Sequence, residues 1–201
     1  GTITVGRSEA VITKRRVAYE AAKAEADEQI RRYDDFWYLW TALRQTLELF
    51  NQHGEIPDLP SRQAEIAAIV ALLDDLACGQ LPQALASFAS GLEGYWGYDQ
   101  RAAQVYQAYS TRYPRDAVQA LALGWPLQRQ ATNSKTYVIR KRLAQDAAFY
   151  FDYAAACMPE AGAVLHKDMI DALESEVRSS SLIENVNSTL RPLLETCRGQ
   201  V

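Results

Sequence analysis

Apolar side chains recur along most of the chain at steps of three and four residues, the spacing of a helix that buries one face. The clearest stripe lies in the second half of a first segment that we expect to be helical from about residue 8 to 50. This stripe consists of Phe36, Leu39, Trp40, Leu43, Leu47 and Phe50. The first half, up to Arg32, is rich in the good helix formers alanine, glutamate, lysine and arginine. We expect a long N-terminal helix, interrupted near Tyr33-Asp34-Asp35 because aspartate prefers a cap to a helix interior.

Glycine and proline divide the middle of the chain into further helices. The run from Pro57 to Pro60 is a stop signal, after which Ser61 is the expected N-cap of a second helix. Three glycines between positions 91 and 97 weaken the third helix and predict a break near Trp96. A short helix is expected from Pro114 to Leu123, ended by Gly124 and Pro126.

Three more helices are expected in the C-terminal part. The first runs from about residue 133 to 157, and its inward side chains should be Leu143, Ala147, Tyr150, Ala154 and Cys157. The second is marked by apolar residues from Leu165 to Val177, and the last begins at Ser180 or Ser181. The one β-like run, residues 2–5, is a single short strand that cannot make a sheet. The pattern therefore predicts an all-α bundle of about six to eight helices with a long N-terminal helix and no substantial sheet.

Aromatic side chains are expected to pack in this bundle rather than to bind ligands. Four tryptophans are better explained as core or interface anchors than as a ligand cage: Trp37, Trp40, Trp96 and Trp125. Five tyrosines stand at helical spacing, where core and rim packing is favoured over stacking on unpaired bases: Tyr95, Tyr98, Tyr106, Tyr109 and Tyr113.

Composition and charge exclude several classes of protein. With 201 residues, 48% hydrophobic and 23% charged, the chain has the balance of a folded domain. A net charge of −4 gives no whole-chain attraction to nucleic acid, so such a role needs a local patch. No apolar run approaches the roughly 20 residues that span a bilayer, and residues 1–16 hold no signal-peptide core. Three scattered cysteines and two histidines make no disulfide framework or zinc spacing, so we expect a cytoplasmic protein.

The run from Arg178 to Pro192 carries the densest chemistry. Taken as a helix, it has one apolar stripe, formed by Ile183, Val186, Leu190 and Leu193. Another face presents Ser180, Glu184, Asn187, Ser188 and Arg191. A carboxylate of this kind can hold a divalent cation, while the guanidinium and amide bind phosphate oxygens. The alternative is a capping box, because Ser181 and Glu184 fit S-x-x-E, and spacing alone favours this alternative.

The same run resembles the stretch around the catalytic glutamate of a group of bacterial insertion-sequence transposases of the DDE class, which have an RNase-H-like core. The pattern is R-x-S-S-x-x-E-x-x-N-S-x-x-R-P, and every fixed position between Arg178 and Pro192 is filled. Residues 33–39, YDDFWYL, also resemble an upstream stretch of those proteins. These two stretches together comprise 22 of the 201 residues, about a tenth of the chain.

The resemblance implies cleavage and rejoining of DNA with two divalent ions, Mg²⁺ or Mn²⁺, held by three carboxylates. Glu184 is then the catalytic and metal-binding glutamate. Four residues are implied to support the metal or the DNA: Arg178, Ser180, Asn187 and Arg191. The partner is DNA at the transposon ends, a homo-oligomer is compatible with this role, and no membrane is involved. The protein would act in the bacterial cytoplasm.

The two aspartates that such an enzyme needs on core strands are not found here, since Asp34 and Asp35 stand in a helical context. We therefore interpret residues 1–177 as an all-helical insertion domain and residues 178–201 as the start of the helix that carries Glu184. The isolated chain is expected to be inactive and to bind no metal. The alternative is an all-helical regulatory or protein-interaction module without catalysis.

A basic cluster opens the helix expected from residue 133: Lys135, Arg140, Lys141 and Arg142. Because these side chains do not share one narrow face, a solvated surface is favoured over contact with DNA phosphates.

Overall fold

The computed structural model describes residues 9–76 and 81–177, which form six α-helices and no strand. The helices are α1 (Glu9–Thr46), α2 (Leu59–Asp75), α3 (Leu81–Arg112), α4 (Arg115–Asn133), α5 (Tyr137–Cys157) and α6 (Gly162–Val177). The predicted all-α class and the long N-terminal helix are confirmed. Across these two ranges, no helix combines the length and the apolar character needed to cross a bilayer.

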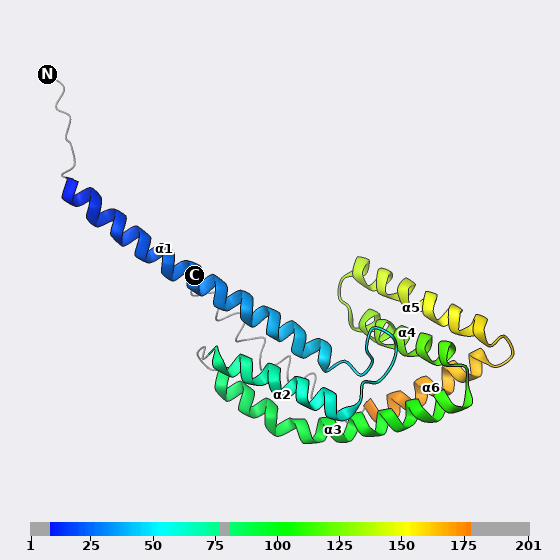
Figure 1. Ribbon diagram of the computed structural model, residues 1–201. Coiled ribbons are helices and arrows are strands. Elements are labelled where there is room, and N and C mark those ends of the chain that lie inside the picture. The colour runs from blue at the N-terminus through cyan, green and yellow to red at the C-terminus, as the bar shows by residue number, and fades with distance from the viewer. Residues whose placement is uncertain (1–8, 77–80, 178–201) are drawn as a thin grey trace.

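The helices form an elongated arrangement (Figure 1). The first half of α1 projects away from the other helices, and its second half packs against α2. Next to α2 lies α3, the second-longest helix of the described part, which also contacts α4 and α6. α4 and α5 form a closely packed hairpin at the other end, and α6 lies between this hairpin and α3.

The core follows the predicted apolar stripes. On α1 the buried side chains are Phe36, Trp40 and Leu43, and the chain just after the helix adds Leu47, Leu49 and Phe50. Leu73 of α2, Leu121 of α4 and Met169 of α6 are at most 1% exposed, and they belong to one hydrophobic core shared by all six helices.

Most of the aromatic residues pack as expected. Tyr95, Tyr98 and Trp125 are buried, and Phe50 meets Trp125 edge-on with ring centroids 6.1 Å apart. The other three tyrosines and Trp96 are half-buried against the core. Trp37 is the exception among the tryptophans, because 49% of its surface is exposed on α1.

The predicted interruption of α1 at Tyr33-Asp34-Asp35 is wrong. The helix continues through these residues, and both carboxylates are exposed. An exposed aspartate keeps its hydration inside a helix. Its weak preference for a cap is outweighed by burial of Phe36, the next residue, and of Trp40 about one turn further on.

The start of α2 also differs from the expectation. Asp58, not Ser61, is the N-cap, and its carboxylate accepts a hydrogen bond from the backbone N–H of Ser61 at 3.0 Å. Pro60 falls in the first turn, where the missing backbone N–H costs no helical bond.

The breaks expected at glycines do not occur. α3 runs without interruption through the three glycines between positions 91 and 97, because Tyr95 and Tyr98 are buried beside them. α4 continues past Gly124 and Pro126 to Asn133. A Cβ on Gly124 would lie 2.5 Å from Cε1 of Phe151 on α5. The glycine is thus a point of close helix contact rather than a helix end.

The ends of the last two described helices shift by a few residues. α5 begins at Tyr137 rather than near residue 133, and it turns Ala147 and Ala154 into the core, with the other three predicted inward residues half-buried. α6 begins at Gly162, one turn before Leu165.

Candidate functional site

The predicted catalytic and DNA-binding residues lie outside the described part of the chain. Glu184 belongs to residues 178–201, and so do its four predicted partners, Arg178, Ser180, Asn187 and Arg191. Their roles, and the start of a helix at Ser180 or Ser181, stay predictions. α6 ends at Val177, so this run follows directly on the described body.

Within residues 9–76 and 81–177, no three histidine, cysteine, aspartate or glutamate side chains gather closely enough to hold a metal ion. Asp34 and Asp35 point to solvent from α1.

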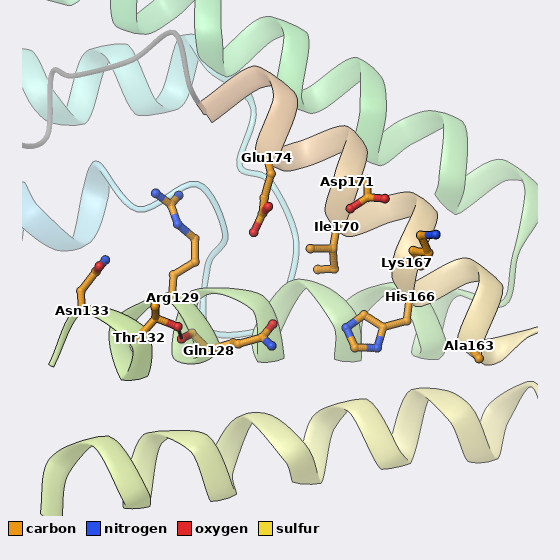
Figure 2. Close-up of a pocket in the computed structure, with 10 residues that line it drawn as sticks. All are labelled: Gln128, Arg129, Thr132, Asn133, Ala163, His166, Lys167, Ile170, Asp171 and Glu174. Carbon is orange, nitrogen blue, oxygen red and sulfur yellow. Dashed lines mark hydrogen bonds between the residues drawn. The ribbon is translucent and has the colours of Figure 1, made fainter. Parts of the chain in front are cut away.

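A polar cleft of about 590 Å³ lies between α4 and α6 (Figure 2). Its walls are two helix faces with steps of three and four residues, so the helical period alone brings the side chains together. The α4 wall consists of Gln128, Arg129, Thr132 and Asn133. The α6 wall consists of Ala163, His166, Lys167, Ile170, Asp171 and Glu174. No single stretch of the sequence marks this cleft, because neither wall has a recognisable motif.

The cleft carries both signs of charge. Two cations, Arg129 and Lys167, are matched by two carboxylates, Asp171 and Glu174. Figure 2 shows Arg129 and Glu174 extending into the space between the helices, and neither forms an ion pair with another described residue. Such a lining suits a polar ligand that carries groups of both charges.

Aromatic rings position two of the cleft side chains. The Arg129 guanidinium lies over the Trp125 ring, 5.2 Å from its centroid, which holds the charge at the cleft edge. His166 packs on Phe151 with ring centroids 4.2 Å apart, and burial lowers the pKa of the imidazole. A lowered pKa favours the neutral imidazole, so His166 adds a hydrogen-bonding group rather than a charge near neutral pH.

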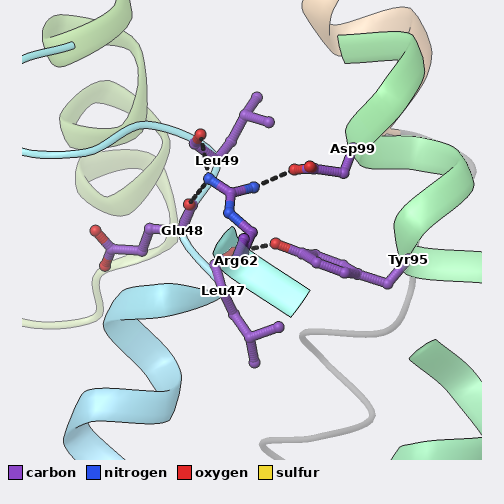
Figure 3. A network of polar contacts seen from close by, with 6 residues as sticks. All are labelled: Leu47, Glu48, Leu49, Arg62, Tyr95 and Asp99. Carbon is purple, nitrogen blue, oxygen red and sulfur yellow. Dashed lines mark hydrogen bonds and ion pairs between the residues drawn. The ribbon is translucent and has the colours of Figure 1, made fainter. Parts of the chain in front are cut away.

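A second polar cluster is fully enclosed (Figure 3). Arg62 of α2 forms an ion pair with Asp99 of α3, and the two residues are 2% and 1% exposed. Arg62 Nη2 also donates to the carbonyl oxygens of Glu48 at 3.0 Å and Leu49 at 2.9 Å. Burial raises the pKa of Asp99, and the charge of Arg62 opposes that rise.

This cluster fixes the chain directly after α1. The hydroxyl of Tyr95 donates to the carbonyl oxygen of Leu47 at 2.9 Å, so three successive carbonyls from Leu47 to Leu49 receive side-chain donors. Backbone carbonyls just past a helix end lack intrahelical partners, and these bonds satisfy them in the core. The cluster therefore orients α1 against α2 and α3.

An open apolar groove of about 710 Å³ runs between α2 and α3. Its apolar lining includes Ile66, Val70, Leu85, Leu92 and Trp96, with small alanines between them. A groove of this character is the kind of surface that accepts an amphipathic helix.

The basic cluster expected to be a solvated surface is exposed in the α4–α5 connection and at the start of α5. Lys135, Arg140, Lys141 and Arg142 all face solvent. Arg142 lies 3.9 Å from Asp146 one turn away, and Arg140 lies over the Tyr137 ring.

Comparison with known proteins gives no match to a family model, a curated protein or a solved structure. A functional proposal for this chain therefore has to come from its own residues.

Proposed function

We propose that the chain is part of a bacterial DDE-class DNA transposase. Residues 1–177 would be an all-helical insertion, and residues 178–201 the start of the helix that carries the catalytic glutamate. The observation that carries this proposal is the run from Arg178 to Pro192, which fills every fixed position of the resembled pattern. The all-helical body that ends at Val177, directly before this run, is compatible with the proposal.

The donor atoms in this run suit the chemistry. Glu184 supplies a carboxylate, Asn187 an amide oxygen and Ser180 a hydroxyl, the hard oxygen ligands that Mg²⁺ and Mn²⁺ prefer. Arg178 and Arg191 add guanidinium groups that bind phosphate oxygens in a bidentate manner. When bound in such a site, two divalent ions activate the attacking oxygen and stabilise the leaving oxygen of phosphoryl transfer. Glu184 would be one of three carboxylates that hold them.

The two remaining carboxylates are not part of this chain in the proposal. The isolated chain is therefore expected not to cleave DNA, whereas the complete protein would cut and join transposon ends.

A second function has one observation in its favour. The apolar groove between α2 and α3 supports a protein-interaction module, in which residues 178–201 serve no catalytic role and Glu184 caps its own helix.

The coding sequence around this chain provides the first test. The transposase proposal requires two aspartates at the ends of hydrophobic strands upstream of residue 1. A gene without them rules the proposal out and favours the interaction module.

A strand-transfer assay on the complete protein provides the second test. We expect Glu184→Gln to abolish Mg²⁺-dependent joining of transposon ends, because the amide cannot replace a charged metal ligand. Glu160→Gln is the matched control, since Glu160 is an exposed glutamate in the connection between α5 and α6. Equal activity of the two variants would refute a catalytic role for Glu184.

A further inference from the structure

Charge is distributed unevenly along this chain. Residues 117–145 contain five cationic side chains and no aspartate or glutamate, although the whole chain has a net charge of −4. The remainder of the chain therefore carries a formal charge of −9. The five cations are Arg129, Lys135, Arg140, Lys141 and Arg142.

The fold gathers these charges at one end of a hairpin. A three-residue connection joins the end of α4 to the start of α5, so positions 129 to 142 lie at the same end of the two helices (Figure 1). α5 lies at the outside of the body, where its main contact is α4. All five cationic side chains are exposed.

Most of these charges have no acidic partner. Among described residues, Arg129, Lys135, Arg140 and Lys141 form no ion pair, and Arg142 has only the distant Asp146 at 3.9 Å. The guanidinium group of Arg129 lies over the Trp125 ring, and that of Arg140 lies over the Tyr137 ring. The cations are therefore available to an external anion.

The neighbouring side chains are neutral hydrogen-bonding groups. Gln128, Gln130, Thr132 and Asn133 are exposed on the last turns of α4. Lysine and arginine beside amides and hydroxyls are the side chains that contact phosphate and sugar oxygens of nucleic acids.

We propose that this surface, residues 128–142, binds the phosphate backbone of duplex DNA; we call it the α4–α5 basic surface. Arg140, Lys141 and Arg142 do not share one narrow face of α5, which counts against insertion of this helix into a groove. Phosphate contacts do not require one narrow face, because cations of the α4–α5 connection and of both helices can lie along the duplex backbone. The remainder of the chain has a net negative charge, which disfavours non-specific contact with DNA away from this surface.

The choice of DNA among polyanions rests on the proposed function. Exposed Tyr137, Val138 and Ile139 beside the cations would also fit an anionic membrane surface. That alternative is a separate outcome of the experiment below.

Salt dependence gives a quantitative expectation. If all five cations neutralise phosphates, log K falls against log salt with a slope of about −4.5. Affinity then drops roughly 500-fold between about 50 and about 200 mM salt.

The experiment measures fluorescence anisotropy of a labelled duplex of arbitrary sequence, titrated with this chain at several salt concentrations. The test variant is Arg140→Gln/Lys141→Gln/Arg142→Gln. The control is Lys14→Gln/Arg15→Gln/Arg16→Gln, which removes the same charge from exposed positions on the projecting part of α1. Circular dichroism of both variants tests whether they keep the helical fold.

We expect the test variant to reduce the salt slope by about 2.7, and the control to leave it unchanged. If both variants lower the salt slope equally, the binding depends on net charge rather than on this surface, and the proposal is overturned. Absence of duplex binding at low salt would overturn it too, as would binding to phosphatidylserine vesicles in place of DNA.

The outcome is separable from the transposase proposal. A gene without upstream aspartates would overturn the transposase proposal, whereas DNA binding through the α4–α5 basic surface could still be observed. Conversely, a gene with these aspartates but no duplex binding by this chain would overturn only the proposal for the surface.

Discussion

Arg62 and Asp99 form an ion pair that joins α2 to α3 out of contact with solvent. Removing two charges from water costs several kcal/mol, which a good pair with additional hydrogen bonds can offset. Arg62 has those additional bonds, because it also donates to the carbonyl oxygens of Glu48 and Leu49. The pair therefore links three segments: the chain directly after α1 and the facing sides of α2 and α3.

Breaking this pair from one side should be costly. We expect Asp99→Leu to lower the free energy of unfolding by about 3–5 kcal/mol, because the Arg62 charge remains buried without a counterion. The double variant Arg62→Met/Asp99→Leu should lose less than the two single variants add up to, since it buries no charge. Urea denaturation followed by circular dichroism measures all three.

The control for this experiment is the exposed pair of Arg16 and Glu20 on α1, whose side chains are 69% and 66% exposed. Glu20→Gln should change stability by less than about 0.5 kcal/mol. A similarly small effect of Asp99→Leu would show that Asp99 is not the buried counterion of Arg62.

Two glycines in helix interiors should respond to alanine with opposite signs. A Cβ at Gly124 meets the Phe151 ring at 2.5 Å, whereas a Cβ at Gly94 meets nothing within 4 Å. We expect Gly124→Ala to destabilise by about 1–3 kcal/mol through overpacking between α4 and α5. Gly94→Ala should stabilise by about 0.5–1 kcal/mol through helix propensity. Thermal or urea unfolding measures the change in stability of each variant. A stabilising Gly124→Ala would contradict the close contact between Gly124 and Phe151.

The pair formed by Glu55 and Arg115 should make stability depend on acid pH. Its hydrogen bond from Arg115 lowers the pKa of Glu55, with a further contribution from the Arg115 charge. A carboxylate with a lowered pKa in the folded state stabilises the fold above its unfolded pKa near 4.5, and this contribution disappears as pH falls through the folded pKa.

The corresponding experiment compares the unmodified chain with Arg115→Met. We expect a difference in unfolding free energy at neutral pH that vanishes once the pH lies well below 4.5, because Glu55 is then protonated in both proteins. Urea denaturation across this range provides the measurement. A difference of constant size at all pH values would mean that Arg115 acts through packing rather than through the charge of Glu55.

The sequence predicted helix identity well and helix ends poorly. The stripe from Phe36 to Phe50 is a local property of the chain, and its residues are buried apart from the half-buried Leu39. Glycine and proline are local signals as well, but their effect depends on the surroundings. At Gly124 the packing of Phe151 turns an expected stop into a helix contact.

The candidate sites also differ in whether a local sequence pattern marks them. The run from Arg178 to Pro192 was recognisable because its residues are contiguous, and its role stays a prediction since it lies outside the described residues. The pair of Arg62 and Asp99 spans 37 positions, and the cleft combines faces of α4 and α6. No local pattern marks either of them.

By itself, the sequence determined an all-α chain, its apolar faces and one contiguous motif, because periodicity and spacing act over a few residues. The tertiary structure decided where the helices end, which polar side chains are buried together and which cations are left exposed at one end. These features depend on contacts between residues far apart in the chain. The energies of such contacts exceed the local helix preferences of single residues, which are about 1 kcal/mol.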